Sequence, residues 1–376
     1  MFELTFNIYS LLISIAFIIA LTFAFILLFS RSQNKQADRF LAAILFIVAF
    51  WNASVLILSI NIHQYANDII WIPLTYTLAL GPCLYFYIQY MTNIEWNSKI
   101  RKWPHFIPVF FQVCLYLFEV FQGLPLGVGY YDTTTYIVFE PIVNALAIIS
   151  LMVYGYIARI QIKKYHEWVD NNYSHTYRYN LNWLLRLSTI MLIVLTIWLG
   201  YYCIDYFLYD YRLSIFEYFP FHLALAVISI WLSVEAFSKP VIIYPETVSS
   251  KKVNSNMSND LEIEEKAVWL KKQIEKNLLY LDPELSLKSL ADTIDIHPNL
   301  VSKIINDGLQ KTFSDCINEY RINAVIKKLN DFEFKNTSFL ALAFDCGFNS
   351  KTTFNRVFKK QNGMTPLQYR NKLKKS

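Results

Sequence analysis

Long apolar runs in the first part of the chain constrain its fold more than any other feature. Each run is long enough to cover the hydrocarbon core of a bilayer, which takes roughly 20 helical residues. After Phe237 the chain turns polar, although 55% of all 376 residues are hydrophobic and only 17% are charged. The pattern predicts an all-α protein with a seven-helix transmembrane bundle over residues 1–237. The predicted spans are Asn7–Ser30, Phe40–Asn61, Ile69–Met91, Pro104–Phe121, Tyr136–Ile162, Trp183–Tyr209 and Phe216–Phe237.

The charges of the loops predict how these spans are oriented. Alternate loops carry lysine and arginine, whereas the loops between them hold none except Arg212. Basic loops favour the cytoplasmic side of a membrane. We therefore expect a multi-pass protein of the cytoplasmic membrane, with its N-terminus outside and everything after the seventh span in the cytoplasm. The basic residues are Arg31, Lys35, Arg39, Lys99, Arg101, Lys102, Lys163, Lys164 and Arg178, with Arg159 just inside a span.

The polar part of the chain begins with a tether. Residues 238–260 are rich in serine, asparagine and lysine and have too few apolar side chains to pack, so they predict a flexible linker. Residues 261–376 then form a separate cytosolic domain. Its first stretch, 261–280, has apolar residues at helical spacing. This lead-in helix could relay movement, pair two protomers, or simply pack on the domain behind it.

Two similar helix-turn-helix patterns follow. Such units need a small residue where their helices cross and a turn residue that tolerates positive φ. Ala291 and Asp295 satisfy this requirement in the first copy. Ala343 and Gly347 satisfy it, at the same separation, in the second copy. The chain therefore predicts a double helix-turn-helix domain.

The segment Leu285–Arg370 closely resembles the DNA-binding domain of the AraC/XylS class of transcription regulators. That resemblance implies two helix-turn-helix units joined by a long helix, here Phe313–Leu329 with Arg321. The first unit departs from the family pattern at Asp295, where glycine is common, and at Ile305, where phenylalanine is usual. The second unit matches best, through Ala343, Gly347, Phe348, Ser350, Phe354, Arg356, Phe358, Lys359, Gly363, Thr365, Pro366, Tyr369 and Arg370.

The membrane part carries a weaker resemblance. The sequences GPCLYFYIQYMT at Gly81–Thr92 and HFIP at His105–Pro108 are similar to the seven-span bodies that precede such domains in some bacterial regulators. This similarity implies a sensor fused to a DNA reader.

The second helix of each unit has an apolar and a polar face at 100° per residue. In the first unit Val301, Ile304 and Ile305 face inward. In the second unit Phe354, Val357 and Phe358 do so. The polar faces carry side chains that can bond base edges or phosphates. The predicted DNA-binding residues are Asn299, Ser302, Lys303, Asn306, Lys351, Thr352, Asn355, Arg356 and Lys359.

Charge at the C-terminus also indicates a nucleic-acid partner. From Lys351 to Ser376 the chain has eight basic residues and no acidic one. Such a patch favours binding to a phosphate backbone that weakens with salt. Two alternatives also explain this charge: a solvated tail, and attachment of the segment to anionic lipid headgroups.

Ionisable residues at membrane depth are candidates for function. Glu119, Glu140, Asp205 and His222 all fall near the predicted outer ends of spans, and they could line an outward-facing ligand pocket. Alternatively, they lie in water at the headgroup level. The five cysteines have no metal-ligand spacing. The residues indicate no catalytic constellation, no metal and no cofactor.

Together these features predict a bacterial membrane-bound one-component transcription regulator, not an enzyme, whose membrane domain senses an unidentified signal. Its expected partners are double-stranded promoter DNA and the lipid bilayer. Contact with RNA polymerase and formation of a homodimer are compatible with this function. Two alternatives stay open: a receptor or transporter whose cytosolic domain binds a protein, and a bundle that only anchors the DNA reader. The signal, the promoters, the direction of regulation and release by proteolysis are also open.

Overall fold

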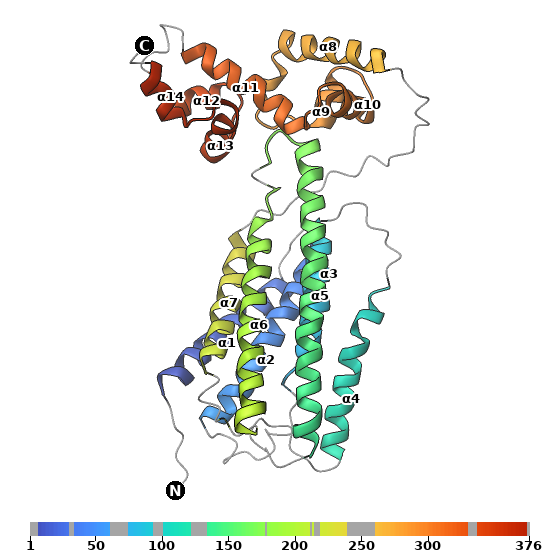
Figure 1. Cartoon of the computed structure of the whole chain (residues 1–376), viewed down its shortest axis with the longest axis vertical. Coiled ribbons are helices and arrows are strands. Elements are labelled where there is room, and N and C mark those ends of the chain that lie inside the picture. The colour runs from blue at the N-terminus through green and yellow to red at the C-terminus, as the bar shows by residue number, and fades with distance from the viewer. Residues whose placement is uncertain are drawn as a thin grey trace. The chain divides into compact units, whose positions relative to one another are not determined.

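A computed structural model describes residues 7–29, 34–60, 74–92, 101–121, 134–176, 179–210, 213, 219–238, 260–329 and 337–373. The described residues form helices and contain no strand, which confirms the predicted all-α class (Figure 1). The chain divides into two compact units. Unit 1 comprises residues 1–163 and 182–244, and unit 2 comprises residues 164–181 and 245–376.

Seven α-helices make up the described part of unit 1, with α1 packed along α2 and α7. One of them, α5, continues beyond Lys163 into unit 2. The helices are α1 (Ile8–Phe29), α2 (Lys35–Ser59), α3 (Leu80–Thr92), α4 (Ile107–Phe121), α5 (Thr134–Asn172), α6 (Asn182–Tyr209) and α7 (Phe219–Ser238), with short 3-10 turns η3 (Thr77–Ala79) and η4 (Trp103–Phe106).

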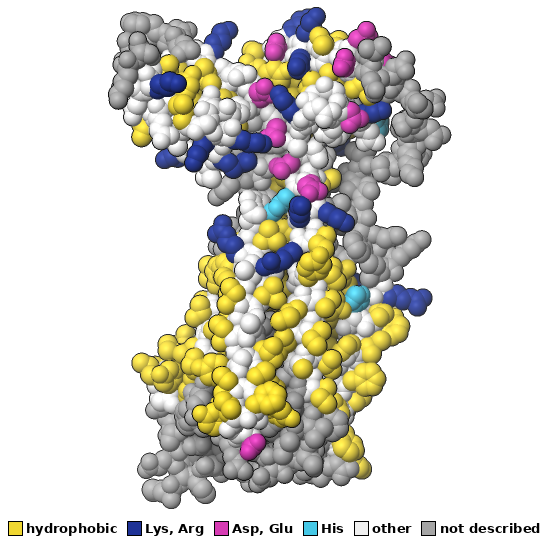
Figure 2. Space-filling model, viewed as in Figure 1, with side chains coloured by type: hydrophobic (Ala, Val, Ile, Leu, Met, Phe, Trp, Pro, Cys, Tyr) yellow, Lys and Arg dark blue, Asp and Glu magenta, His cyan; other side chains and the backbone are white. Residues whose placement is uncertain are grey.

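The helices of unit 1 differ in their capacity to cross a membrane. Among the described residues, four of them, α1, α2, α5 and α6, have stretches long and apolar enough to do so, and α4 and α7 contain shorter apolar stretches. Many large apolar side chains of this unit are exposed, and Phe110, Phe121 and Phe207 are each more than 60% exposed. Figure 2 shows apolar side chains spread over the face of unit 1 that is in view. Apolar exposure on this scale is unusual for a surface that faces water.

Helix α3 is shorter than the apolar run Ile69–Met91 suggests. It has 13 residues and begins at Leu80, after the 3-10 turn η3, and residues 69–73 lie outside the described part of the chain. Pro82 falls in the first helical turn, where a residue without an N–H is tolerated. Eleven of the 13 residues are buried, so α3 is enclosed by its neighbours.

A glycine brings α3 close to α5. A Cβ added at Gly81 would lie 2.5 Å from the Ser150 hydroxyl and 2.8 Å from the Tyr154 ring. Next to this contact the His105 ring is 2.8 Å from the Tyr154 hydroxyl and stacks on Tyr85. The sequence features Gly81–Thr92 and His105–Pro108 therefore meet at one helix crossing.

Unit 2 contains the C-terminal helices (Figure 1). The second helix of the first helix-turn-helix, α10, continues as a short π-helical turn, η7. The elements are α8 (Asp260–Lys276), η6 (Leu279–Leu281), α9 (Leu287–Thr293), α10 (Pro298–Lys303), η7 (Ile304–Gly308), α11 (Phe313–Leu329), α12 (Phe339–Asp345), α13 (Lys351–Asn362) and α14 (Pro366–Leu373). Residues 239–259, most of the predicted linker, lie outside the described part.

Each helix-turn-helix has its own apolar core, and α11 contributes to both. Phe313 and Ile317 of α11 pack in the first core, whereas Ile322 and Val325 pack in the second. Helix α8 inserts its apolar face into the first core through Ala267, Leu270 and Ile274. Of the readings open for the lead-in helix, packing on the domain behind it is the one observed.

Candidate nucleic-acid interface

The first helix-turn-helix is built from local signals. Ser286 caps α9, because its hydroxyl accepts a hydrogen bond from the Ser289 N–H. Ala291 is fully buried where the helices cross. Asp295 has φ of +54°, so it makes the turn in the left-handed region where glycine is usual.

The second helix-turn-helix repeats this construction. Ser338 caps α12, Ala343 is fully buried, and Gly347 makes the turn with φ of +89°. A Cβ at Gly347 would lie 2.4 Å from the Tyr280 carbonyl oxygen, so this position requires glycine for space as well as for conformation. Both turns have the geometry that the sequence spacing predicts.

In the first helix-turn-helix, the apolar side of α10 and η7 is buried through Val301, Ile304 and Ile305. The predicted DNA-binding residues differ in accessibility. Asn299 is exposed, whereas Ser302, Lys303 and Asn306 are half-buried, and the Asn306 side-chain amide lies 3.3 Å from the Ser302 hydroxyl.

The second reader helix, α13, separates its two faces more cleanly. Ser350 caps it, with its hydroxyl accepting from the Thr353 N–H at 3.1 Å. Phe354, Val357 and Phe358 are buried in the second core. All five residues predicted to contact DNA from this helix are exposed, namely Lys351, Thr352, Asn355, Arg356 and Lys359.

Charge on this helix is partly neutralised by unit 2 itself. Figure 2 shows lysine and arginine side chains gathered over the part of unit 2 that contains α12 and α13. Lys360 pairs with Asp315 of α11 at 2.7 Å. Arg370 donates to the Thr337 carbonyl at 2.6 Å and stacks on the Phe339 ring, so it holds structure.

The Arg321 side chain is 1% exposed and joins several segments of unit 2. It donates to the Tyr280 carbonyl at 2.7 Å and to the Asp282 carbonyl at 2.6 Å. Burial lowers the pKa of its guanidinium to about 10, so it stays charged at neutral pH. A buried cation is tolerated here because backbone carbonyls and hydroxyls surround it.

Arg321 also binds a residue that the sequence did not single out. Its Nη2 lies 3.1 Å from the hydroxyl of Ser174, which follows helix α5. The Ser174 hydroxyl in turn donates to the Leu285 carbonyl at 2.7 Å, and Asn318 donates to the Ser174 carbonyl at 3.2 Å. Ser174 lies in an ordinary polar loop sequence, so no motif marks it.

The candidate ligand pocket of unit 1 is only partly described. Asp205 is buried and accepts a hydrogen bond from the Leu213 N–H at 3.1 Å. His222 is buried too, with its ring against Trp51. The side chains of Glu119 and Glu140 lie outside the described part of the structure. A shared pocket therefore stays a prediction.

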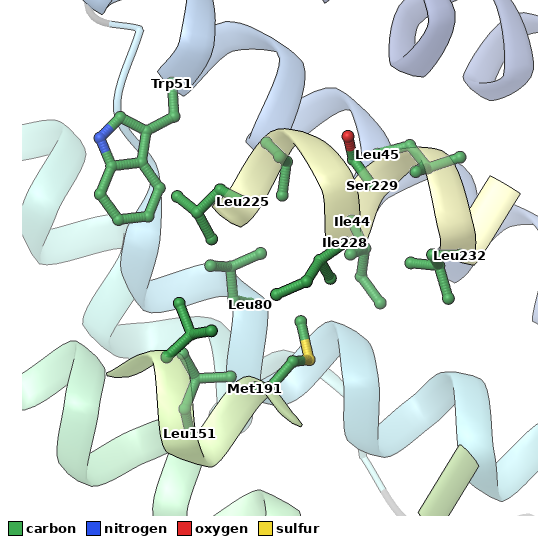
Figure 3. Close-up of a pocket in the computed structure, with 12 residues that line it drawn as sticks. Ile44, Leu45, Trp51, Leu80, Leu151, Met191, Leu225, Ile228, Ser229 and Leu232 are labelled. Carbon is green, nitrogen blue, oxygen red and sulfur yellow. The ribbon is translucent and has the colours of Figure 1, made fainter. Parts of the chain in front are cut away.

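A small apolar cavity lies elsewhere in unit 1, among α2, α3, α5, α6 and α7 (Figure 3). Its lining includes Trp51, Leu80, Met191 and Leu225, but neither Asp205 nor His222. The centres of water-sized molecules can occupy about 20 Å³ of it.

The cysteines of unit 2 are packing residues. Cys316 and Cys346 are free and buried in the two cores. Burial raises the pKa of the Cys316 thiol to about 12, so the reactive thiolate is scarce at neutral pH. Among the described residues, no group of three or more histidine, cysteine, aspartate or glutamate side chains could hold a metal ion.

Comparison with known proteins agrees with this geometry. Residues 290–372 match a family described as "Helix-turn-helix domain", which confirms the predicted fold of this region. The chain is 33% identical over 89 residues to the melibiose operon regulatory protein of Escherichia coli K12, and equally so to that of E. coli O6:H1. The alignment covers 24% of this chain and 28% of those relatives. No solved structure matches the chain.

Proposed function

We propose that this chain is a bacterial membrane-bound transcription regulator of the AraC type that binds promoter DNA through both helix-turn-helix units. The outward face of α13 carries the proposal most directly, because it exposes Asn355 and Arg356 on a helix whose opposite face is fully packed. Arginine suits guanine and asparagine suits adenine in the major groove. The similarity to a regulatory protein supports the same class.

The proposed place of action is the inner face of the cytoplasmic membrane. Long apolar helices and the apolar surface of unit 1 support a membrane-embedded body, and the alternation of basic loops supports a cytoplasmic unit 2. A signal received by the seven-span body would alter DNA binding. Each helix-turn-helix would enter one major-groove segment, and the two segments would lie about one helical turn apart.

The test uses the full chain in lipid nanodiscs. Genomic fragments of the source organism are selected for binding at moderate salt, and the best fragment is titrated against random competitor DNA. We expect Asn355→Ala and Arg356→Ala each to cost about 1–3 kcal/mol of discrimination on that fragment. Lys272→Ala is the matched control, because it removes an exposed positive charge from α8. The proposal fails if no fragment is preferred over random DNA, or if the α13 variants behave like this control.

A further inference from the structure

The segment that follows α5 binds the DNA-reading unit of its own chain. Tyr173 forms an isolated antiparallel bridge with Ser286, the capping residue of α9. The Ser174 N–H donates to the Leu285 carbonyl at 3.2 Å, in addition to the hydroxyl bonds with Leu285 and Arg321. Ser174 is fully buried in this contact. Backbone and side-chain hydrogen bonds thus join Ser174 to residues 111 or more positions away in the chain.

A helix flanks this segment on each side. Helix α5 runs without a break to Asn172, and α6 begins at Asn182. The Leu181 N–H donates to Nε2 of His166 at 3.0 Å, and the Tyr173 ring packs on Tyr179 with a centroid distance of 4.3 Å. Residues 164–176 and 179–181, the described part of the chain between Lys163 and α6, are what we call the α5–α6 connector.

The connector also brings an acidic group near the second reader helix. The carboxylate of Asp170, in the last turn of α5, interacts electrostatically with Arg356 and Lys360 of α13, and with Asp315 of α11. Lys360 is already paired with Asp315. A negative charge in the neighbourhood of Arg356 and Lys360 weakens the attraction of this part of α13 for the phosphates of DNA.

We propose that the α5–α6 connector is an internal inhibitory ligand of the DNA-binding unit: docked at Ser174, it brings the negative charge of Asp170 into the neighbourhood of α13 and weakens binding to DNA. The outward face of α13 is exposed in this state, so the inhibition is electrostatic: release of the connector removes the negative charge of Asp170 from the neighbourhood of α13. We call the contacts of Tyr173 and Ser174 with the DNA-binding unit the dock. The dock includes Arg321 on α11, the helix that is shared by both cores and links the two helix-turn-helix units. This inference rests on the proposed function for its effect on DNA, but not for the dock itself.

The dock is tested with a cysteine pair in the full chain in nanodiscs. Tyr173→Cys with Ser286→Cys places two thiols at an antiparallel bridge, where Cα atoms are about 4.5–5.5 Å apart and within disulfide reach. We expect rapid cross-linking under mild oxidation, seen as protection of both introduced thiols from maleimide. The two single variants are the controls. Absence of a cross-link between the two introduced cysteines overturns the dock, whatever the protein does with DNA.

Inhibition is tested with the selected promoter fragment as the probe. We expect the oxidised pair to bind this DNA severalfold more weakly than the same protein after reduction, and saturating DNA to slow the cross-linking. Asp170→Asn should bind severalfold more tightly than wild type. Glu167→Gln removes an exposed acid about one turn earlier in α5 and should have little effect.

The outcomes separate the two proposals. If wild type prefers no DNA sequence, the proposed function fails, while the cross-link still decides whether the dock exists. If wild type binds its promoter but neither the disulfide nor Asp170→Asn changes affinity, the inhibitory role is wrong and the proposed function stands.

Discussion

Gly347 lies directly against the backbone of Tyr280, so that a Cβ on the glycine would be 2.4 Å from the tyrosine carbonyl oxygen. The same carbonyl accepts a hydrogen bond from Arg321 at 2.7 Å. The turn of the second helix-turn-helix, the lead-in to the first, and the shared helix α11 therefore meet at one point. Both DNA-reading units depend on this junction for their positions.

We expect Gly347→Ala to destabilise unit 2 by about 3 kcal/mol. Roughly 1–2 kcal/mol comes from the left-handed conformation of an alanine, and a similar amount comes from overpacking against Tyr280. Hydrogen exchange of α11 to α14 in the full chain measures this loss. Gly363→Ala is the control, because Gly363 also has positive φ, +70°, but its Cβ would meet nothing within 4 Å. Equal losses in the two variants would contradict the close contact.

Arg321→Met should destabilise unit 2 by about 1–3 kcal/mol, because the part-buried Tyr280 and Asp282 carbonyls and the buried Ser174 hydroxyl would lose their partner. Lys327→Met, which replaces an exposed cation on the same helix, should change stability by less than about 0.5 kcal/mol. Denaturant midpoints from pulse proteolysis of unit 2 in the full chain compare the two. A neutral Arg321→Met would show that the buried network does not stabilise the unit.

In unit 1 the α3–α5 crossing depends on the missing side chain of Gly81. Gly81→Ala should lower the melting temperature in nanodiscs, because its Cβ would overlap Ser150. Adding Ser150→Ala removes the closest atom and should restore part of the loss. Gly200→Ala, with nothing within 4 Å of the new Cβ, should cause no loss. If Ser150→Ala gives no rescue, the crossing is not as close as described.

The salt dependence of DNA binding should distinguish two neighbouring lysines. Lys359→Gln should reduce the slope of log affinity against log salt by about 0.9, the value for one phosphate contact. Lys360→Gln should reduce it less, because Lys360 already pairs with Asp315. Titrations at several salt concentrations give both slopes. A larger reduction of the slope for Lys360→Gln than for Lys359→Gln would show that Lys360, and not Lys359, contacts the phosphate.

Local signals explain which parts of the fold the sequence predicts. The buried alanines, the turns at Asp295 and Gly347, and the outward face of α13 each depend on residues close together in the chain. The shared helix occupies Phe313–Leu329, the range the resemblance implied. Where long-range packing decides, the sequence says less. Helix α3 is shorter than its apolar run. Hydropathy alone does not show that the α-helix begins at Leu80, two residues before Pro82.

The candidate site shows the same limit. Exposure of Lys351, Thr352 and Asn355 follows from periodicity alone. The half-buried state of Lys303 does not, nor does the contact between Ser174 and Arg321, which joins residues 147 positions apart. No periodicity or motif encodes such a pairing in a single sequence.

The central claim is that the intact membrane protein reads promoter sequence. Genome-wide crosslinking of the full-length tagged chain in its own cells, with its size followed on a blot, tests this most directly. We predict enrichment of a common motif with two parts about one helical turn apart, bound by full-length protein from the membrane fraction, and loss of that enrichment with Asn355→Ala and Arg356→Ala together. Uniform recovery of genomic DNA, unchanged in that double variant, would contradict the account.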